Sequence, residues 1–241
     1  MRYSKYFKSE QKIFLRSLTA DATSGRLDAL TVYFHEEHGD YFDLLLPYQT
    51  REEENFPFSP DMPFEILSDT MGLGVRLTGN FVEQRRQDLI RLRVNNDLQI
   101  FQRRLASRLD VTVGLRYTKG QGTLRSFREQ WEKNVRILRN TKDFSKIPPF
   151  PQTSVNLSNG GIRFQIKPPI RIADLCLLLL KLEENEAPLC ALAEVVWLDE
   201  EEVQGRRCAG MQFLSILEAD QKRIIDFIKK VPPASGEKSA G

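Results

Sequence analysis

Three arginines, Arg103, Arg104 and Arg108, fall within six residues near the middle of the 241-residue chain. A guanidinium group is a rigid planar fork that can donate two parallel hydrogen bonds to a phosphate or to the O6/N7 edge of guanine. The spacing Arg-x-x-x-Arg therefore indicates a segment that binds an anion or a guanine. The alternative is a solvated basic linker, which is the commoner structure for an isolated pattern of this kind.

A second polar pattern, Asn156-Leu-Ser158-Asn-Gly160-Gly161, lies between two predicted strands. Asn156 and Ser158 have side chains that form hydrogen bonds, and the two glycines leave the backbone without a Cβ. The alternative is a plain hairpin, because Asn-Gly is the preferred pair for a tight primed turn.

The overall charge limits the classes of partner. The chain carries 35 Lys and Arg against 33 Asp and Glu, a formal net charge of +2. This balance disfavours a general coat for nucleic acid polymers, so anion binding has to come from local clusters. The charged N-terminal residues do not form a signal peptide and no apolar run could span a bilayer, which predicts a cytoplasmic protein without membrane insertion.

Other residues that could take part in catalysis or bind a metal lack the neighbouring residues that such sites require. Cys176, Cys190 and Cys208 are widely spaced among apolar residues, which predicts buried thiols in a reducing compartment. His35-Glu-Glu-His38 has no third ligand nearby, and Lys119-Gly-Gln-Gly-Thr123 lacks the order of a phosphate-binding loop. We therefore expect no enzyme, no metal site and no cofactor.

Alternation of apolar and polar residues predicts a mainly-β (α+β) protein with two antiparallel β-barrel domains. The first domain, residues 1–97, is expected to contain a helix over 5–18 and strands over 27–35, 41–48, 64–67, 75–82 and 89–94. The second, residues 98–231, is expected to contain strands over 110–117, 153–157, 161–166, 174–182, 189–198 and 208–214. Residues 232–241 are predicted to be a flexible tail.

The second domain is also predicted to contain two helices, one inserted over 123–140 and one terminal over 218–230. Apolar residues at three- and four-residue steps give the inserted helix one buried stripe. Its other face is expected to be solvated, or to form a basic docking surface. That face carries Arg125, Arg128, Lys133, Arg136 and Arg139.

Together, Arg104/Arg108 and Asn156/Ser158/Gly161 resemble the PilZ domain, the receptor module for cyclic di-GMP. The family pattern is Arg-x-x-x-Arg before the first barrel strand, followed by Asp/Asn-x-Ser-x-x-Gly. The segments 193–197 and 209–213, followed by the terminal helix, look like the closing strands and helix of that family. The resemblance covers residues 98–231, and the preceding domain looks like the N-terminal barrel of flagellar-brake-type PilZ proteins. The 47 residues from 109 to 155 are a longer interval than the pattern needs, and the insertion over 119–150 accounts for it.

The resemblance implies a cyclic di-GMP receptor that changes the arrangement of its two domains when ligand binds. Its output would be motility or a biofilm-type response through a protein partner such as a flagellar motor component. Arg103, beside the motif, could hold a second ligand molecule, and the stoichiometry and oligomeric state stay open. The implied ligand-binding residues are Arg103, Arg104, Arg108, Asn156, Ser158, Gly160 and Gly161.

Two other classes of function remain as alternatives. One is a PilZ-like interaction module that does not bind ligand. The other is a single-stranded nucleic-acid binder, which the near-neutral charge and the lack of a dense aromatic and basic stripe disfavour.

Overall fold

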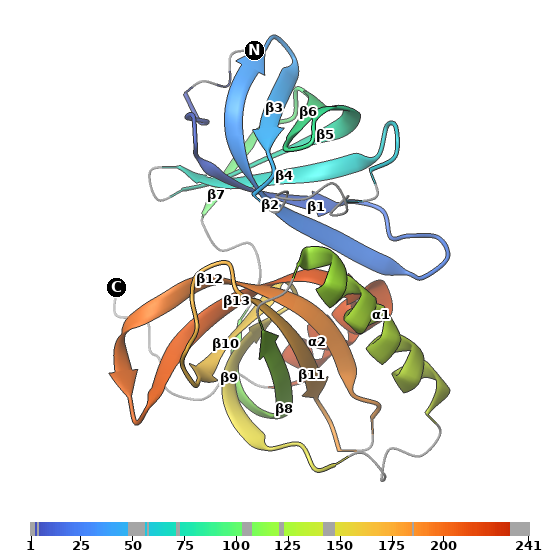
Figure 1. Cartoon of the computed structure of the whole chain (residues 1–241), viewed down its shortest axis with the longest axis vertical. Coiled ribbons are helices and arrows are strands. Elements are labelled where there is room, and N and C mark those ends of the chain that lie inside the picture. Colours follow the sequence, from blue (N-terminus) through green and yellow to red (C-terminus); the bar gives the residue numbers. More distant parts are fainter. Residues whose placement is uncertain are drawn as a thin grey trace. The chain divides into compact units, whose positions relative to one another are not determined.

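The computed structural model describes residues 3, 5–47, 56, 58–70, 73–102, 108–120, 123–141, 148–184 and 186–231. The chain forms two compact units (Figure 1), one from residues 1–105 with 123–125 and one from residues 106–122 with 126–241. Within the described residues, antiparallel strands predominate and the two helices are one inserted and one C-terminal. The predicted mainly-β class with these two helices is confirmed.

The strands of the first unit pair in a closed ring. β1 pairs with both β2 and β4, and the remaining pairings run β4–β5–β6–β3–β2. β7 (Gln99–Gln102) pairs with Leu73–Arg76 at the start of β5, ahead of the residues of β5 that pair with β6. The ring consists of β1 (Lys12–Ser17), β2 (Arg26–His38), β3 (Tyr41–Leu45), β4 (Pro63–Thr70), β5 (Leu73–Arg86) and β6 (Leu89–Val94).

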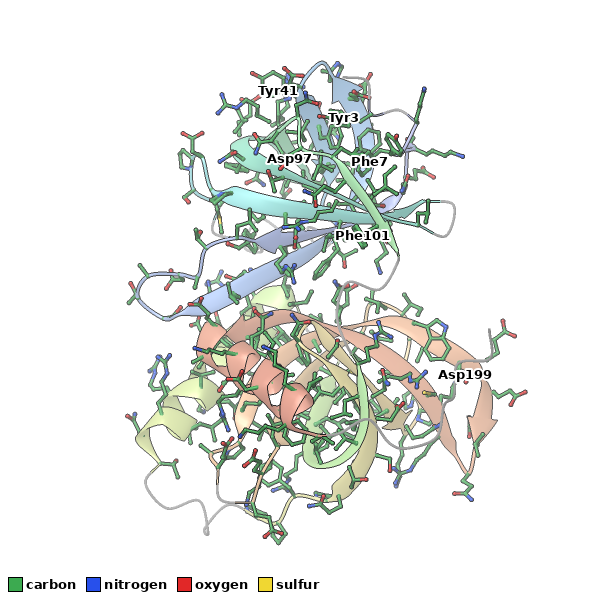
Figure 2. All side chains as sticks on the ribbon, turned by 180° about the vertical axis from the view of Figure 1, so that it is seen from behind. Tyr3, Phe7, Tyr41, Asp97, Phe101 and Asp199 are labelled. Atoms are coloured by element: carbon green, nitrogen blue, oxygen red, sulfur yellow. The ribbon has the colours of Figure 1, made fainter. Side chains whose placement is uncertain are left out.

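The core of the first unit follows from the two-residue period of these strands, which turns alternate side chains inward. Ile13, Leu15, Phe42 and Leu92 are fully buried. Aromatic rings extend this core, because Phe7 and Tyr3 lie 5.1 and 5.5 Å from Phe42 between ring centroids. Tyr3 and Phe7 are labelled on the first unit in Figure 2.

The helix predicted over residues 5–18 is wrong, because Lys12–Ser17 forms β1. Ile13 and Leu15 alternate with half-buried residues and face the core, as in a strand. The local sequence fits a loose helical stripe as well, but only a strand here can pair with both β2 and β4 and close the ring. The tertiary pairing therefore overrides the local pattern.

Buried charges in the first unit are paired across strands. Arg91 donates two hydrogen bonds to Asp43, at 2.7 and 2.8 Å, and this pairing lowers the pKa of the Asp43 carboxyl. Glu65 is buried between Arg16 and Arg76, which both contact its carboxylate. These ion pairs offset the desolvation cost that each carboxylate would have if it were buried without a partner.

The strands of the second unit also pair in a closed ring, in the order β8–β9–β10–β13–β12–β11–β8. Leu157, Leu178, Leu192 and Val195 are fully buried inside it. The helices are α1 (Leu124–Asn140) and α2 (Glu218–Lys230), close to the predicted bounds. The strands are β8 (Leu109–Gly120), β9 (Gln152–Ser158), β10 (Gly161–Ile166), β11 (Leu175–Lys181), β12 (Leu189–Val203) and β13 (Arg206–Leu217).

One face of α1 is buried, as its apolar stripe predicts. Trp131 is 1% exposed, and its Nε1–H donates a hydrogen bond of 3.0 Å to the Cys190 backbone oxygen on β12. Arg128, which we expected on the solvated face, is buried instead. Position 128 lies four residues after Leu124 and three before Trp131, so helix geometry places it on the buried stripe. The other four arginines and lysines of the predicted basic face are exposed.

The predicted burial is confirmed for two of the three cysteines. Cys176 and Cys190 are fully buried in neighbouring strands, and burial raises the pKa of each thiol to about 12. Both thiols are therefore protonated at neutral pH. The third cysteine, Cys208, is only half-buried. No group of three or more metal-ligating side chains suited to a metal ion occurs among the described residues. Neither described helix has the length and apolar character needed to cross a membrane.

Candidate functional site

The predicted site residues of the second motif lie on one hairpin. Asn156 is on β9, Ser158 ends that strand, Gly160 is in the turn and Gly161 begins β10. Arg108 is exposed and directly precedes β8. Arg103 and Arg104 lie outside the described residues.

The strand register brings Arg108 and the second motif to the same end of neighbouring strands. Leu109 pairs with Leu157 and Asp110 pairs with Asn156. Arg108 therefore enters the sheet beside the Asn-x-Ser strand, although residues 109–155 separate the two motifs along the chain. This juxtaposition is what a composite binding site made from both motifs requires.

The β9–β10 turn is held by hydrogen bonds on three sides. The Ser158 hydroxyl donates to the Gly161 backbone oxygen at 3.2 Å, and the Phe213 amide of β13 donates to the Gly160 oxygen at 3.0 Å. The Gln221 side chain of α2 donates to the Asn159 oxygen at 3.2 Å. Ser158 is buried, so in this structure its hydroxyl fastens the turn, and its oxygen keeps acceptor capacity.

The two glycines of the motif have different surroundings. A Cβ on Gly161 would lie 2.3 Å from the Met211 backbone oxygen, so close packing of β10 on β13 requires glycine there. A Cβ on Gly160 would meet nothing within 4 Å. Neither Asn159 nor Gly160 has a positive φ, so the hairpin does not contain the primed turn that its Asn-Gly pair would favour. Neither backbone conformation nor packing explains the glycine at 160.

A row of residues runs across the outer face of the sheet from Asn156, and the sequence analysis missed all of its members except Asn156. Asn156 pairs with Arg163 on β10, Arg163 with Gly210 on β13, and Gly210 with Trp197 on β12. Residues directly opposite on paired strands point to the same face. We call this set the outer row; from β8 to β12 it consists of Asp110, Asn156, Arg163, Gly210 and Trp197.

The members of the outer row contact their neighbours. The Asn156 Nδ2–H donates to Asp110 Oδ1 at 2.8 Å, and the Arg163 guanidinium lies 3.8 Å from the same oxygen. The Trp197 ring lies over Gly210, 3.5 Å from where a Cβ would stand. The alternation of β10 marks Arg163 as an outward position, but only the register shows that it lies beside Asn156.

The outer row has the functional groups for binding a nucleotide. The Arg163 and Trp197 side chains are 48% and 46% exposed, respectively. A guanidinium can bind phosphate or guanine, an indole can stack on a base, and the carboxylate and amide can read a base edge. Between Arg163 and Trp197, Gly210 has no side chain of its own, and the Trp197 ring lies over it.

A shallow cavity of about 380 Å³ lies elsewhere, between α2 and the loop after β11. Its lining carries three basic and three acidic side chains, and the Arg223 guanidinium is already paired with Glu186 and Asp220, each at 2.9 Å. The acidic partners leave little positive charge for an anion, so the cavity is not the candidate site.

Comparisons with known proteins bear on the second unit most directly. The model of the PilZ domain family matches residues 102–230. The search of curated proteins found no match.

Several solved structures match over most of the chain at low identity. The Bacillus subtilis inhibitor of motility, MotI/DgrA, is 13% identical, with 93% of this chain and 97% of that chain covered and a TM-score of 0.37. YcgR from Escherichia coli in complex with c-di-GMP is 13% identical, with coverages of 91% and 83% and a TM-score of 0.30. The complex of K. pneumonia MrkH with c-di-GMP is 13% identical, with coverages of 91% and 85% and a TM-score of 0.30. These likenesses are remote, and the family match is the stronger finding.

Proposed function

The chain belongs to the PilZ domain family, and from this premise we propose that it is a receptor for cyclic di-GMP. The observation that carries the proposal is the register of β8 on β9, which places the end of the Arg-x-x-x-Arg motif beside the Asn-x-Ser-x-x-Gly hairpin. A receptor module that requires no catalytic group or cofactor agrees with the prediction that the chain is not an enzyme.

The chemistry of the ligand suits these residues. Cyclic di-GMP presents two phosphates and two guanines, and each guanine offers its O6 and N7 acceptors to an arginine fork. Arg104 and Arg108 supply such forks in our proposal, and Arg103 contacts a second ligand molecule. Asn156 contributes hydrogen bonds, and the open backbone at Gly160 accounts for a glycine that packing does not require.

Replacing either arginine of the motif should weaken ligand binding strongly. Arg104→Ala and Arg108→Ala each remove one bidentate contact, worth about 1–3 kcal/mol, which corresponds to a roughly ten- to hundredfold increase in Kd. Isothermal titration with cyclic di-GMP measures this change. Arg136→Ala, which removes an exposed arginine from α1, is the matched control and should bind like the unmodified protein.

The same titration separates the proposed receptor from the alternatives. A lack of measurable heat or competition with the unmodified protein at tens of micromolar ligand contradicts the receptor and leaves the ligand-independent interaction module. RNA binding that falls steeply with salt and ignores cyclic di-GMP favours the nucleic-acid binder instead.

We further propose that ligand binding changes the arrangement of the two units. The arginine motif lies on the connection between the first ring of strands and β8, so a ligand that holds these arginines constrains that connection. Small-angle scattering should show a change in the radius of gyration at saturating cyclic di-GMP, and no change for Arg104→Ala at the same concentration. Equal scattering curves for the unmodified protein with and without bound ligand would contradict the rearrangement.

The rearranged protein would act in the cytoplasm through a protein partner. We propose a flagellar motor component as that partner, and motility or a biofilm-type response as the output. Co-purification in the presence and absence of ligand identifies it.

A further inference from the structure

Asp110 stands out in the outer row because it is an acidic residue within a site proposed to bind a dianion. Its side chain is 78% exposed, so burial does not explain it. Its carboxylate contacts two neighbours, accepting a hydrogen bond from Asn156 at 2.8 Å and lying 3.8 Å from the Arg163 guanidinium. An acidic group in this place raises the electrostatic cost of binding phosphates, so a specific contact has to compensate for it.

The contact with Asp110 determines how the Asn156 amide is oriented. Its NH₂ group faces the carboxylate, because the opposite orientation would place two acceptor oxygens against each other. Asn156 Oδ1 therefore points away from Asp110, and no described side chain donates a hydrogen bond to it. Asp110 Oδ2 and Asn156 Oδ1 together offer two acceptors on the outer face of β8 and β9.

Two adjacent acceptors distinguish guanine from adenine. The Watson–Crick edge of guanine carries N1–H and N2–H₂ donors, whereas adenine has an unprotonated N1 acceptor and no donor at C2. Reading of an unpaired base by hydrogen bonds to this edge is a common mode of recognition. Arginine contacts to phosphate carry no such information, because all cyclic dinucleotides share the phosphates.

We propose that Asp110 is the guanine-selecting residue of this site: its Oδ2 accepts a hydrogen bond from one of the two donors on the guanine edge, N1–H or N2–H₂, and its contact with Asn156 holds Asn156 Oδ1 in place to accept the other. This inference rests on the proposed function as a cyclic di-GMP receptor. The positive charge of Arg163 reduces the repulsion between the Asp110 carboxylate and the ligand phosphates. Asp110 therefore improves selectivity for guanine at a small cost in affinity.

Asp110→Asn tests the inference, because it keeps the shape of the side chain and removes its charge at an exposed position. Calorimetric titrations of both proteins with cyclic di-GMP and cyclic di-AMP should show that the variant binds cyclic di-GMP roughly ten- to a hundredfold more weakly. Its affinity for cyclic di-AMP should stay the same or rise, so the ratio of the two affinities falls. Asp226→Asn, which removes one exposed carboxylate from α2, should leave both affinities unchanged.

The outcomes separate the two proposals. If the unmodified protein does not bind cyclic di-GMP, the proposed function fails and the inference fails with it. If the unmodified protein binds and Asp110→Asn binds cyclic di-GMP equally well or more tightly, the receptor stands and the role of Asp110 is overturned. An equal loss of affinity for both dinucleotides also overturns selection, because it indicates a purely structural role.

Discussion

Gly161→Ala is expected to destabilise the second unit by about 3 kcal/mol or more, the upper range for overpacking a well-ordered site. The added Cβ would lie 2.3 Å from the Met211 backbone oxygen, and a backbone atom cannot turn aside as a flexible side chain can. Relief requires β10 and β13 to separate, which weakens pairing between strands that close the ring. Denaturant unfolding measures the change in free energy.

Gly160→Ala is the matched control, because it adds the same methyl group one residue earlier. Nothing lies within 4 Å of that methyl group and φ is not positive, so the cost to stability should stay within about 0.5 kcal/mol. Cyclic di-GMP binding should nevertheless weaken if the ligand approaches this backbone. Equal losses of stability in the two variants would contradict the packing described for Gly161.

Trp131→Ala is expected to cost about 3–5 kcal/mol, the usual range for removing a large buried aromatic side chain. The substitution creates a cavity under α1 and leaves the Cys190 backbone oxygen without the indole donor. We therefore expect the inserted helix to be part of the folded core and not an accessory that the ring of strands can lose. Thermal and denaturant unfolding of the full chain measure the effect.

Two further variants make the Trp131 result specific. Trp131→Phe keeps much of the ring volume and loses the hydrogen bond, so its cost should be intermediate. Ile137→Ala, on the same helix but 52% exposed, should cost less than about 0.5 kcal/mol. A cost below about 1 kcal/mol for Trp131→Ala would show that α1 contributes little to the stability of this unit.

Much of the fold could be predicted because strand and helix periods are local properties of a sequence. The alternation in Leu89–Val94 and the stripe of the terminal helix are sufficient without any knowledge of neighbours. β1 and β7 could not be predicted in this way. β1 forms only because it pairs with a strand on each side. β7 pairs with β5 at Gly74, where a Cβ would collide with the ring of Phe101 on β7 (Phe101 is labelled in Figure 2).

Arg128 shows a different limit of prediction. The chemistry of arginine favours solvent, so sequence reasoning assigned it to the exposed face of α1. Its helical position relative to Leu124 and Trp131 decides its burial instead. Position on the helix, and not side-chain type, predicts which face a residue occupies.

Order and spacing along the chain were enough to predict the two motifs, the mainly-β class and the resemblance to PilZ domains. The tertiary structure alone decided which residues stand beside them. Periodicity shows which face of a strand a residue occupies, but the partner across the sheet depends on a register between distant segments. That register joins Asp110 to Asn156 and extends the candidate site to Arg163 and Trp197.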